Sequence, residues 1–133
     1  MEWVFAPARA GDIIRVRVRF YHHYGIFVSE DEVIQFGARD NSGIDPKEIR
    51  VLTTDISAFA GGEQVQCAKL SPSEKKGRRS VKETIEYARE QLGRDGYDIL
   101  HNNCEHFVNE CVFAKAHSNF LEEVRKAVRE RLR

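Results

Sequence analysis

The residues best suited to chemistry lie in one short run, His101-Asn-Asn-Cys-Glu-His-Phe-Val108. Cys104 stands there at the point where apolar residues begin to recur at helical spacing. Asn102 or Asn103 can serve as the N-cap of that helix. A cysteine in the first turn of a helix lies at the positive end of the helix dipole, which favours the thiolate. We therefore predict that Cys104 is a nucleophile with a pKa below the ordinary thiol value of about 8.5.

The other two cysteines, Cys67 and Cys111, have apolar neighbours and are typical of inert core residues. Three scattered cysteines form neither a disulfide framework nor a CxxC metal pair, so no metal and no other cofactor is expected. Because a free thiolate persists in a reducing compartment, we expect a cytoplasmic protein.

The base that activates a cysteine must come from another part of the chain. The run Tyr21-His-His-Tyr-Gly-Ile-Phe-Val28 is rich in aromatic and β-branched residues, and it predicts a central strand over 23–29. An acidic turn and a return strand over 33–36 complete a hairpin, which brings His23 close to Gln35. Alternation sends His22 and His23 to opposite faces of the strand, so only one of them can face the cysteine.

The strand before this hairpin, 13–19, alternates apolar residues with Arg15, Arg17 and Arg19. This pattern predicts a half-buried antiparallel strand with a basic outer face. The arginines could form a stripe that binds phosphate, but a solvated strand face is the expected explanation.

The remaining elements follow from turn and cap signals. Ser80-Val-Lys-Glu83 is a capping box that opens a helix over 80–92, and a second helix covers 104–115. Strands followed by helices predict an α+β fold, an antiparallel sheet with helices packed on it. The other predicted segments are an irregular lead-in over 1–11, a loop over 39–48, short strands over 49–52 and 63–68, a helical turn over 53–59, a mobile loop over 71–79 and an amphipathic helix over 118–133.

Composition sets further limits. The 133 residues suit one domain, 1–133, with its core over about 11–118. The 21 basic and 21 acidic residues balance, so no nucleic-acid partner is expected. No apolar run could span a bilayer and no signal peptide is expected at the N-terminus. Peripheral membrane contact would occur through 71–79 or 118–133; a solvated loop and a helix that caps the core are the alternatives.

Three motifs together resemble the lecithin:retinol acyltransferase-like family, which belongs to the permuted, papain-like NlpC-type superfamily. The motifs are His23-Tyr-Gly-Ile-Phe-Val28, Val33-Ile-Gln35 and Asn103-Cys-Glu-His-Phe107. The resemblance extends from about Gly11 to Ser118, with the histidine strand before the cysteine helix, as in the permuted order. It implies a circularly permuted papain-like fold.

The resemblance also implies roles for particular residues. Cys104 would be the nucleophile and His23 its general base. The family's usual third residue, another histidine, falls at Gln35, whose carboxamide can accept the imidazole N–H and fix its tautomer. The implied reaction is acyl transfer from an ester, in the first place a phospholipid, through an acyl-thioester to water, an amine or an alcohol.

Stabilisation of the oxyanion has several candidates. The backbone N–H of Cys104 would contribute about 3 kcal/mol if well placed. The side chains of Tyr24, Tyr21 and Asn103 are further candidates for contact with the substrate or its oxyanion. For Glu105 and His106, a charge in the first helical turn and a packing or hydrogen-bonding role are the expected explanations.

Two other functions stay open. One is a permuted cysteine peptidase or amidase, as found among relatives in the superfamily. The other is a non-catalytic interaction module, because some picornaviral proteins share the histidine and Asn-Cys pattern. Gln35, which replaces the usual histidine, favours that second alternative.

Overall fold

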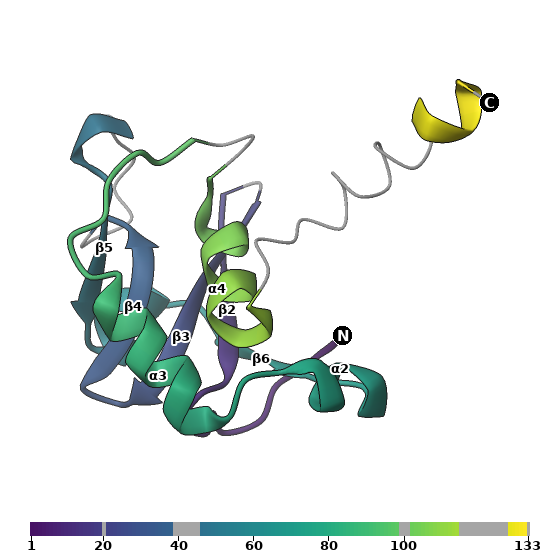
Figure 1. Cartoon of the computed structure of the whole chain (residues 1–133). Coiled ribbons are helices and arrows are strands. Elements are labelled where there is room, and N and C mark those ends of the chain that lie inside the picture. Colours follow the sequence, from purple (N-terminus) through teal and green to yellow (C-terminus); the bar gives the residue numbers. More distant parts are fainter. Residues whose placement is uncertain (20, 39–45, 99–101, 115–127, 133) are drawn as a thin grey trace.

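The fold is built around a six-stranded antiparallel sheet with the order β1-β6-β2-β3-β4-β5. The computed structural model describes residues 1–19, 21–38, 46–98, 102–114 and 128–132 (Figure 1). The predicted α+β fold with an antiparallel sheet is confirmed. The strands are β1 (Glu2–Val4), β2 (Ile13–Val18), β3 (Tyr21–Ser29), β4 (Glu32–Gly37), β5 (Arg50–Thr54) and β6 (Gln66–Lys69), and the helices are η1 (Pro46–Glu48), α1 (Ile56–Ala60), α2 (Pro72–Gly77), α3 (Val81–Glu90) and α4 (Cys104–Phe113).

β3 is one of the two central strands of the sheet, and it pairs with β2 on one side and with β4 on the other. Its partners in β2 run from Ile13 opposite Ile26 to Val18 opposite Tyr21. The hairpin with β4, which the sequence predicted, puts Gly25 directly opposite Gln35.

Both faces of the sheet are buried. Helices α3 and α4 cover one face, where Ile26, Ile34 and Phe36 pack against α4 (Figure 1). On the other face, Phe59 of α1 packs against Val16 and other alternate residues of the strands. Successive side chains of β3 therefore enter two different cores.

Two predictions about the chain's irregular segments were wrong. The segment 71–79 contains helix α2, because Ser71 and Glu74 form a capping box ahead of it and Pro72 occupies its first turn. The prediction of a loop relied on the many basic residues of this segment and overlooked the capping box. The N-terminal segment 1–11 contains β1, a three-residue strand that forms by pairing with β6, a contact across the chain that local sequence does not encode.

The predicted helices over 80–92 and 104–115 are present, and Ser80 is the N-cap of α3 as expected. The predicted helical turn over 53–59 begins later, at Ile56, because Asp55 is its N-cap. Most of the predicted loop 39–48 and of the predicted helix 118–133 lies outside the described residues. No helix in the described residues has both the length and the apolar character needed to cross a membrane.

We predict that Gly25→Ala destabilises the protein. A Cβ at this position would lie 2.8 Å from Cε2 of Phe59 and 3.1 Å from Cγ1 of Val33. Overpacking of this kind costs about 1–3 kcal/mol. Urea denaturation should show this loss in the free energy of unfolding. Gly77→Ala is the control, because its Cβ would meet no atom within 4 Å, and an equal loss in both variants would contradict the packing explanation.

Candidate active site

Cys104 is the first residue of α4, as predicted, and the N-cap is Asn103. The Asn103 side chain accepts a hydrogen bond from the backbone N–H of His106 at 3.0 Å, and Nδ1 of His106 accepts from the backbone N–H of Asn103 at 3.1 Å. This capping box fixes the start of the helix. It gives His106 the hydrogen-bonding role that the sequence predicted, and it engages the side chain of Asn103 in the cap.

The thiol of Cys104 is buried against β3. It forms a hydrogen bond with the backbone of Tyr24, the residue that follows His23. A second hydrogen bond joins the thiol to the side chain of Tyr97. The sequence analysis did not identify Tyr97 as a site residue, because the sequence around Gly96 and Tyr97 indicates only a turn.

The predicted depression of the Cys104 pKa is wrong for this structure. Burial raises the pKa of the thiol to about 11, although hydrogen bonds with the backbone of Tyr24 and of Cys104 itself act to lower it. Desolvation penalises the thiolate more than the helix N-terminus stabilises it. Burial also raises the pKa of Cys67 and Cys111. Near pH 7 the Cys104 side chain is therefore a neutral thiol.

His23 and Gln35 are brought together as the hairpin predicted. Nε2 of His23 lies 2.5 Å from Oε1 of Gln35, and Nε2 of Gln35 donates to Oγ1 of Thr54 at 2.7 Å. With its nitrogen donating to Thr54, the amide presents its oxygen to the imidazole, so Nε2 of His23 carries the proton and Nδ1 is unprotonated. The sequence analysis did not identify Thr54, which comes from the neighbouring strand β5.

The imidazole of His23 is neutral near pH 7. Burial lowers its pKa, and the hydrogen bond with Gln35 acts in the opposite direction. A neutral imidazole with an unprotonated Nδ1 can accept a proton, so His23 has the protonation state that a general base requires.

Cys104 and His23 lie on different faces of the sheet: Cys104, in α4, contacts the backbone of Tyr24, the residue next to His23 in β3. His23 packs against Phe59, with ring centroids 5.4 Å apart, whereas Tyr24 belongs to the face that α4 covers. Alternation places His22 on that same face. Within the described residues, the pairing of β3 with β4 begins at Gly25 and Gln35, so the two strands are unpaired where the thiol contacts Tyr24.

Close approach of the histidine ring to β4 requires a glycine. A Cβ on Gly37 would lie 2.8 Å from Cε1 and 3.1 Å from Nε2 of His23. The imidazole therefore fills the space beside β4 next to this unpaired stretch, and a larger residue at 37 would displace it.

The two tyrosines of β3 differ in their surroundings. Tyr24 forms a hydrogen bond with Glu105, and burial together with this carboxylate raises the Tyr24 pKa to about 12. Its neighbour Arg15 stacks over Trp3 at 4.1 Å from the ring centroid. Tyr21 is 56% exposed at the end of the strand.

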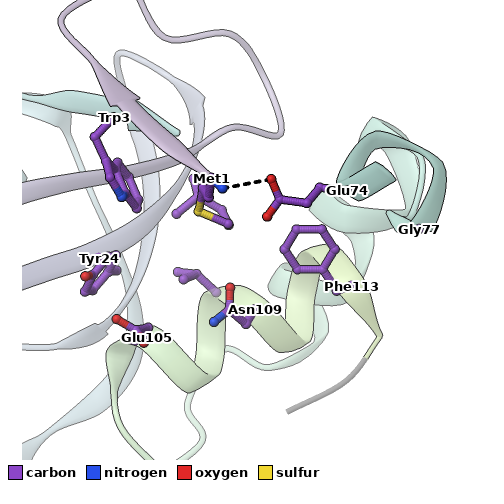
Figure 2. A pocket seen from close by; sticks show the side chains of 10 residues that line it. Met1, Trp3, Tyr24, Glu74, Gly77, Glu105, Asn109 and Phe113 are labelled. Atoms are coloured by element: carbon purple, nitrogen blue, oxygen red, sulfur yellow. Dashed lines mark ion pairs between the residues drawn. The ribbon is translucent and has the colours of Figure 1, made fainter. Parts of the chain in front are cut away.

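A cavity of about 510 Å³ runs along α4 from this point (Figure 2). Tyr24 and Glu105 lie at one end of it and Phe113 at the other. Glu105 follows Cys104 in the chain and Tyr24 contacts the Cys104 thiol, but Cys104 is not among the lining residues. Its volume is within the usual range for ligand sites. The lining residues are Met1, Trp3, Ile13, Tyr24, Glu74, Gly77, Glu105, Val108, Asn109 and Phe113. The described part of the chain holds no cluster of three or more His, Cys, Asp or Glu residues able to bind a metal ion.

Comparison with known proteins identifies relatives of the whole domain. The sequence profile of the family described as "Lecithin retinol acyltransferase" matches residues 6–117. Rat lecithin retinol acyltransferase is 25% identical over 139 residues, which cover 90% of this chain and 60% of the relative, and the bovine protein is 29% identical over 146 residues. Human phospholipase A and acyltransferase 3 is 25% identical over 126 residues, which cover 87% of this chain and 77% of the relative. The chain thus spans about 60% of the lecithin retinol acyltransferases.

We predict that the buried His23 makes the protein less stable in acid. Because its folded-state pKa is lowered, the unfolded chain binds more protons below the ordinary histidine pKa of about 6.5. The free energy of unfolding should therefore fall as the pH drops below that value. Urea denaturation at several pH values should show a shallower fall for His23→Gln.

His22→Gln provides the comparison. The pKa of His22 is also lowered, but its ring is only partly buried, so this substitution should remove less of the pH dependence. An unchanged pH dependence in His23→Gln would show that His23 does not carry the effect.

Proposed function

Because this chain belongs to the lecithin retinol acyltransferase family, we propose that it cleaves an ester of a lipid through an acyl-thioester on Cys104. His23 is the general base and Gln35 orients it. The observation that carries this proposal is the hydrogen-bond chain from Thr54 through Gln35 to His23, which leaves Nδ1 of the imidazole free to accept a proton.

The hydrogen bonds of Gln35 with Thr54 and with His23 explain how a glutamine can replace the histidine that is usual in the family at this position. The work of the third residue is to hold the tautomer and orientation of the base, and a carboxamide oxygen can do both. Gln35 is 1% exposed and is itself held by Thr54. A fixed amide therefore supports turnover, although it stabilises the imidazolium less than a carboxylate would.

The proposed reaction proceeds by general base catalysis. As Sγ of Cys104 attacks the ester carbonyl carbon, its proton moves to Nδ1 of His23. The carbonyl oxygen becomes an oxyanion near the backbone N–H of Cys104 and the hydroxyl of Tyr97. Collapse of this intermediate breaks the ester C–O bond, and the imidazolium returns the proton to the departing alcohol. Water or an acceptor alcohol or amine then attacks the thioester, again with His23 as base.

The protonation states favour this order over a preformed ion pair. The raised pKa of Cys104 and the lowered pKa of His23 both stabilise the neutral pair in the resting protein. The thiolate therefore forms as the substrate is attacked, when the developing charge passes to the oxyanion. A buried thiol held in this way is also protected from oxidation between turnovers.

Proton transfer requires Nδ1 of His23 and Sγ of Cys104 to approach one another. We place that approach at the stretch where β3 and β4 are unpaired, between Tyr24 and Gly37. In the part of the chain that the structure describes, β3 forms no ladder pairs with β4 there, and it stays paired with β2 at Tyr24 and His23. His22 is the alternative base, because it shares the face of β3 that α4 covers.

The cavity along α4 provides room for the acyl chain. It begins at Tyr24 and Glu105, near Cys104, and its lining mixes the apolar side chains of Trp3, Val108 and Phe113 with the polar ones of Glu74, Glu105 and Asn109. An acyl chain lying along the helix would place its carbonyl carbon at the Cys104 end.

We predict that Cys104→Ala and His23→Ala each abolish the acyl adduct that the wild-type protein forms with a short-chain phospholipid or an activated ester. Mass spectrometry of the intact protein and of its peptides would detect the adduct and locate it. Cys67→Ala is the matched control and should keep the adduct, because this cysteine is distant in sequence and packs on the other face of the sheet.

Two further variants separate the roles of the neighbouring groups. Gln35→Ala should slow adduct formation less than His23→Ala, because it removes orientation rather than a reacting group, and Gln35→His should preserve or raise the rate. Loss of the adduct in His22→Ala but not in His23→Ala would assign the base to His22. A folded wild-type protein that forms no adduct with ester, amide or phospholipid would instead favour the non-catalytic interaction module.

A further inference from the structure

The end of the β2–β3 hairpin carries a concentration of basic side chains. Arg17 pairs with His22 across the two strands, and Arg15 pairs with Tyr24. Arg19 follows at the turn, where its φ of 55° is left-handed. Arg17 and Arg19 are both exposed. We call Arg15, Arg17 and Arg19 the basic hairpin end.

Within the described residues no ion pair involves any of the three arginines. Arg15 is half-buried and donates to Oε1 of Gln66 at 2.8 Å, so Arg17 and Arg19 are the charges available to a partner. The whole chain has a formal net charge of zero, so the basic hairpin end is a local excess. The acidic residues of the next turn, Glu30 to Glu32, lie at the opposite end of β3, where Glu32 forms an ion pair with Arg89. The hairpin is therefore positive at one end and negative at the other.

The basic hairpin end borders the nucleophile. Arg15 stands opposite Tyr24, whose backbone contacts the thiol of Cys104. Tyr21 is 56% exposed at the same end of β3, and it lies close enough to Tyr97 to affect its ionisation. Figure 1 shows these ends of β2 and β3 beside the start of α4. A surface that bound the arginines would thus meet the chain at the mouth of the candidate active site.

We propose that the basic hairpin end docks onto the anionic headgroups of a lipid bilayer and presents the N-terminal end of α4 to the membrane surface. The choice of a bilayer rests on the proposed function, since a protein that acts on lipid esters must meet its substrate at a lipid surface. Each arginine near an anionic leaflet contributes about 1 kcal/mol, and an exposed tyrosine suits the polar–apolar boundary.

Other anionic partners fit the observations less well. A nucleic acid would favour basic residues spread over one face of a positively charged domain, but this chain is neutral overall. The lysines of α2, which the sequence singled out for membrane contact, lie next to the far end of the cavity, where Glu74 and Gly77 line it. They are distant along α4 from Cys104, so they provide a matched control.

The test measures co-sedimentation of the full chain with vesicles of phosphatidylcholine, with and without phosphatidylserine. The wild-type protein should bind the vesicles that contain phosphatidylserine, and added salt should weaken the binding. Arg17→Gln with Arg19→Gln should reduce the affinity by about fivefold for each arginine, which corresponds to about 1 kcal/mol each. Lys75→Gln with Lys76→Gln removes the same charge and should leave the affinity within about twofold of the wild type.

Several outcomes would overturn the docking proposal. They are equal binding to both kinds of vesicle, an equal loss in the arginine and lysine variants, and full competition by glycerophosphate or by an oligonucleotide. The docking and the proposed reaction can fail separately. Arg17→Gln with Arg19→Gln should form the acyl adduct with a soluble activated ester at the wild-type rate, and Cys104→Ala should bind vesicles as the wild type does. Loss of adduct with the soluble ester in the arginine variant would show that these residues act on the site itself.

Discussion

The packing of α4 across β3 is the contact on which the candidate site depends. It presses the first residue of the helix, Cys104, against the backbone of Tyr24, and the surrounding apolar side chains exclude water. This one contact buries the thiol and raises its pKa, and it also sets one wall of the cavity along the helix. A helix N-terminus alone favours a thiolate, but in this fold the cost of desolvation is larger.

On the other face of the sheet, a polar chain lies within an apolar core. His23 and Gln35 are both nearly inaccessible, and each would cost free energy if left without partners. Thr54 accepts a hydrogen bond from the Gln35 amide nitrogen, which fixes the orientation of the amide. The amide oxygen then faces Nε2 of His23. Such a network specifies one tautomer and one orientation of the imidazole. The glutamine is therefore consistent with an organised site rather than with a degraded one.

The two parts of the candidate site, Cys104 on one side and His23 with Gln35 on the other, therefore lie on opposite faces of β3. The neutral thiol of Cys104 lies on one face of the sheet and the neutral imidazole of His23 on the other. Beside this point the described residues of β3 and β4 form no ladder pairs beyond the pair of Gly25 and Gln35, whereas β3 stays paired with β2. At the same end of the hairpin lie the exposed Arg17, Arg19 and Tyr21, so positive charge stands near the residues that contact Cys104.

Local sequence was enough for the features that depend on neighbouring residues. The alternation of β2 and β3, the hairpin that joins His23 to Gln35 and the cap ahead of Cys104 were all predictable, because each arises from spacing of two to twelve residues. The motifs around His23 and Cys104 also indicated the family. Tertiary structure alone decided the pKa of Cys104, the roles of Thr54 and Tyr97 and the pairing of β1 with β6. These depend on burial and on contacts between distant segments, and the free energy of desolvation is fixed only when the chain has packed.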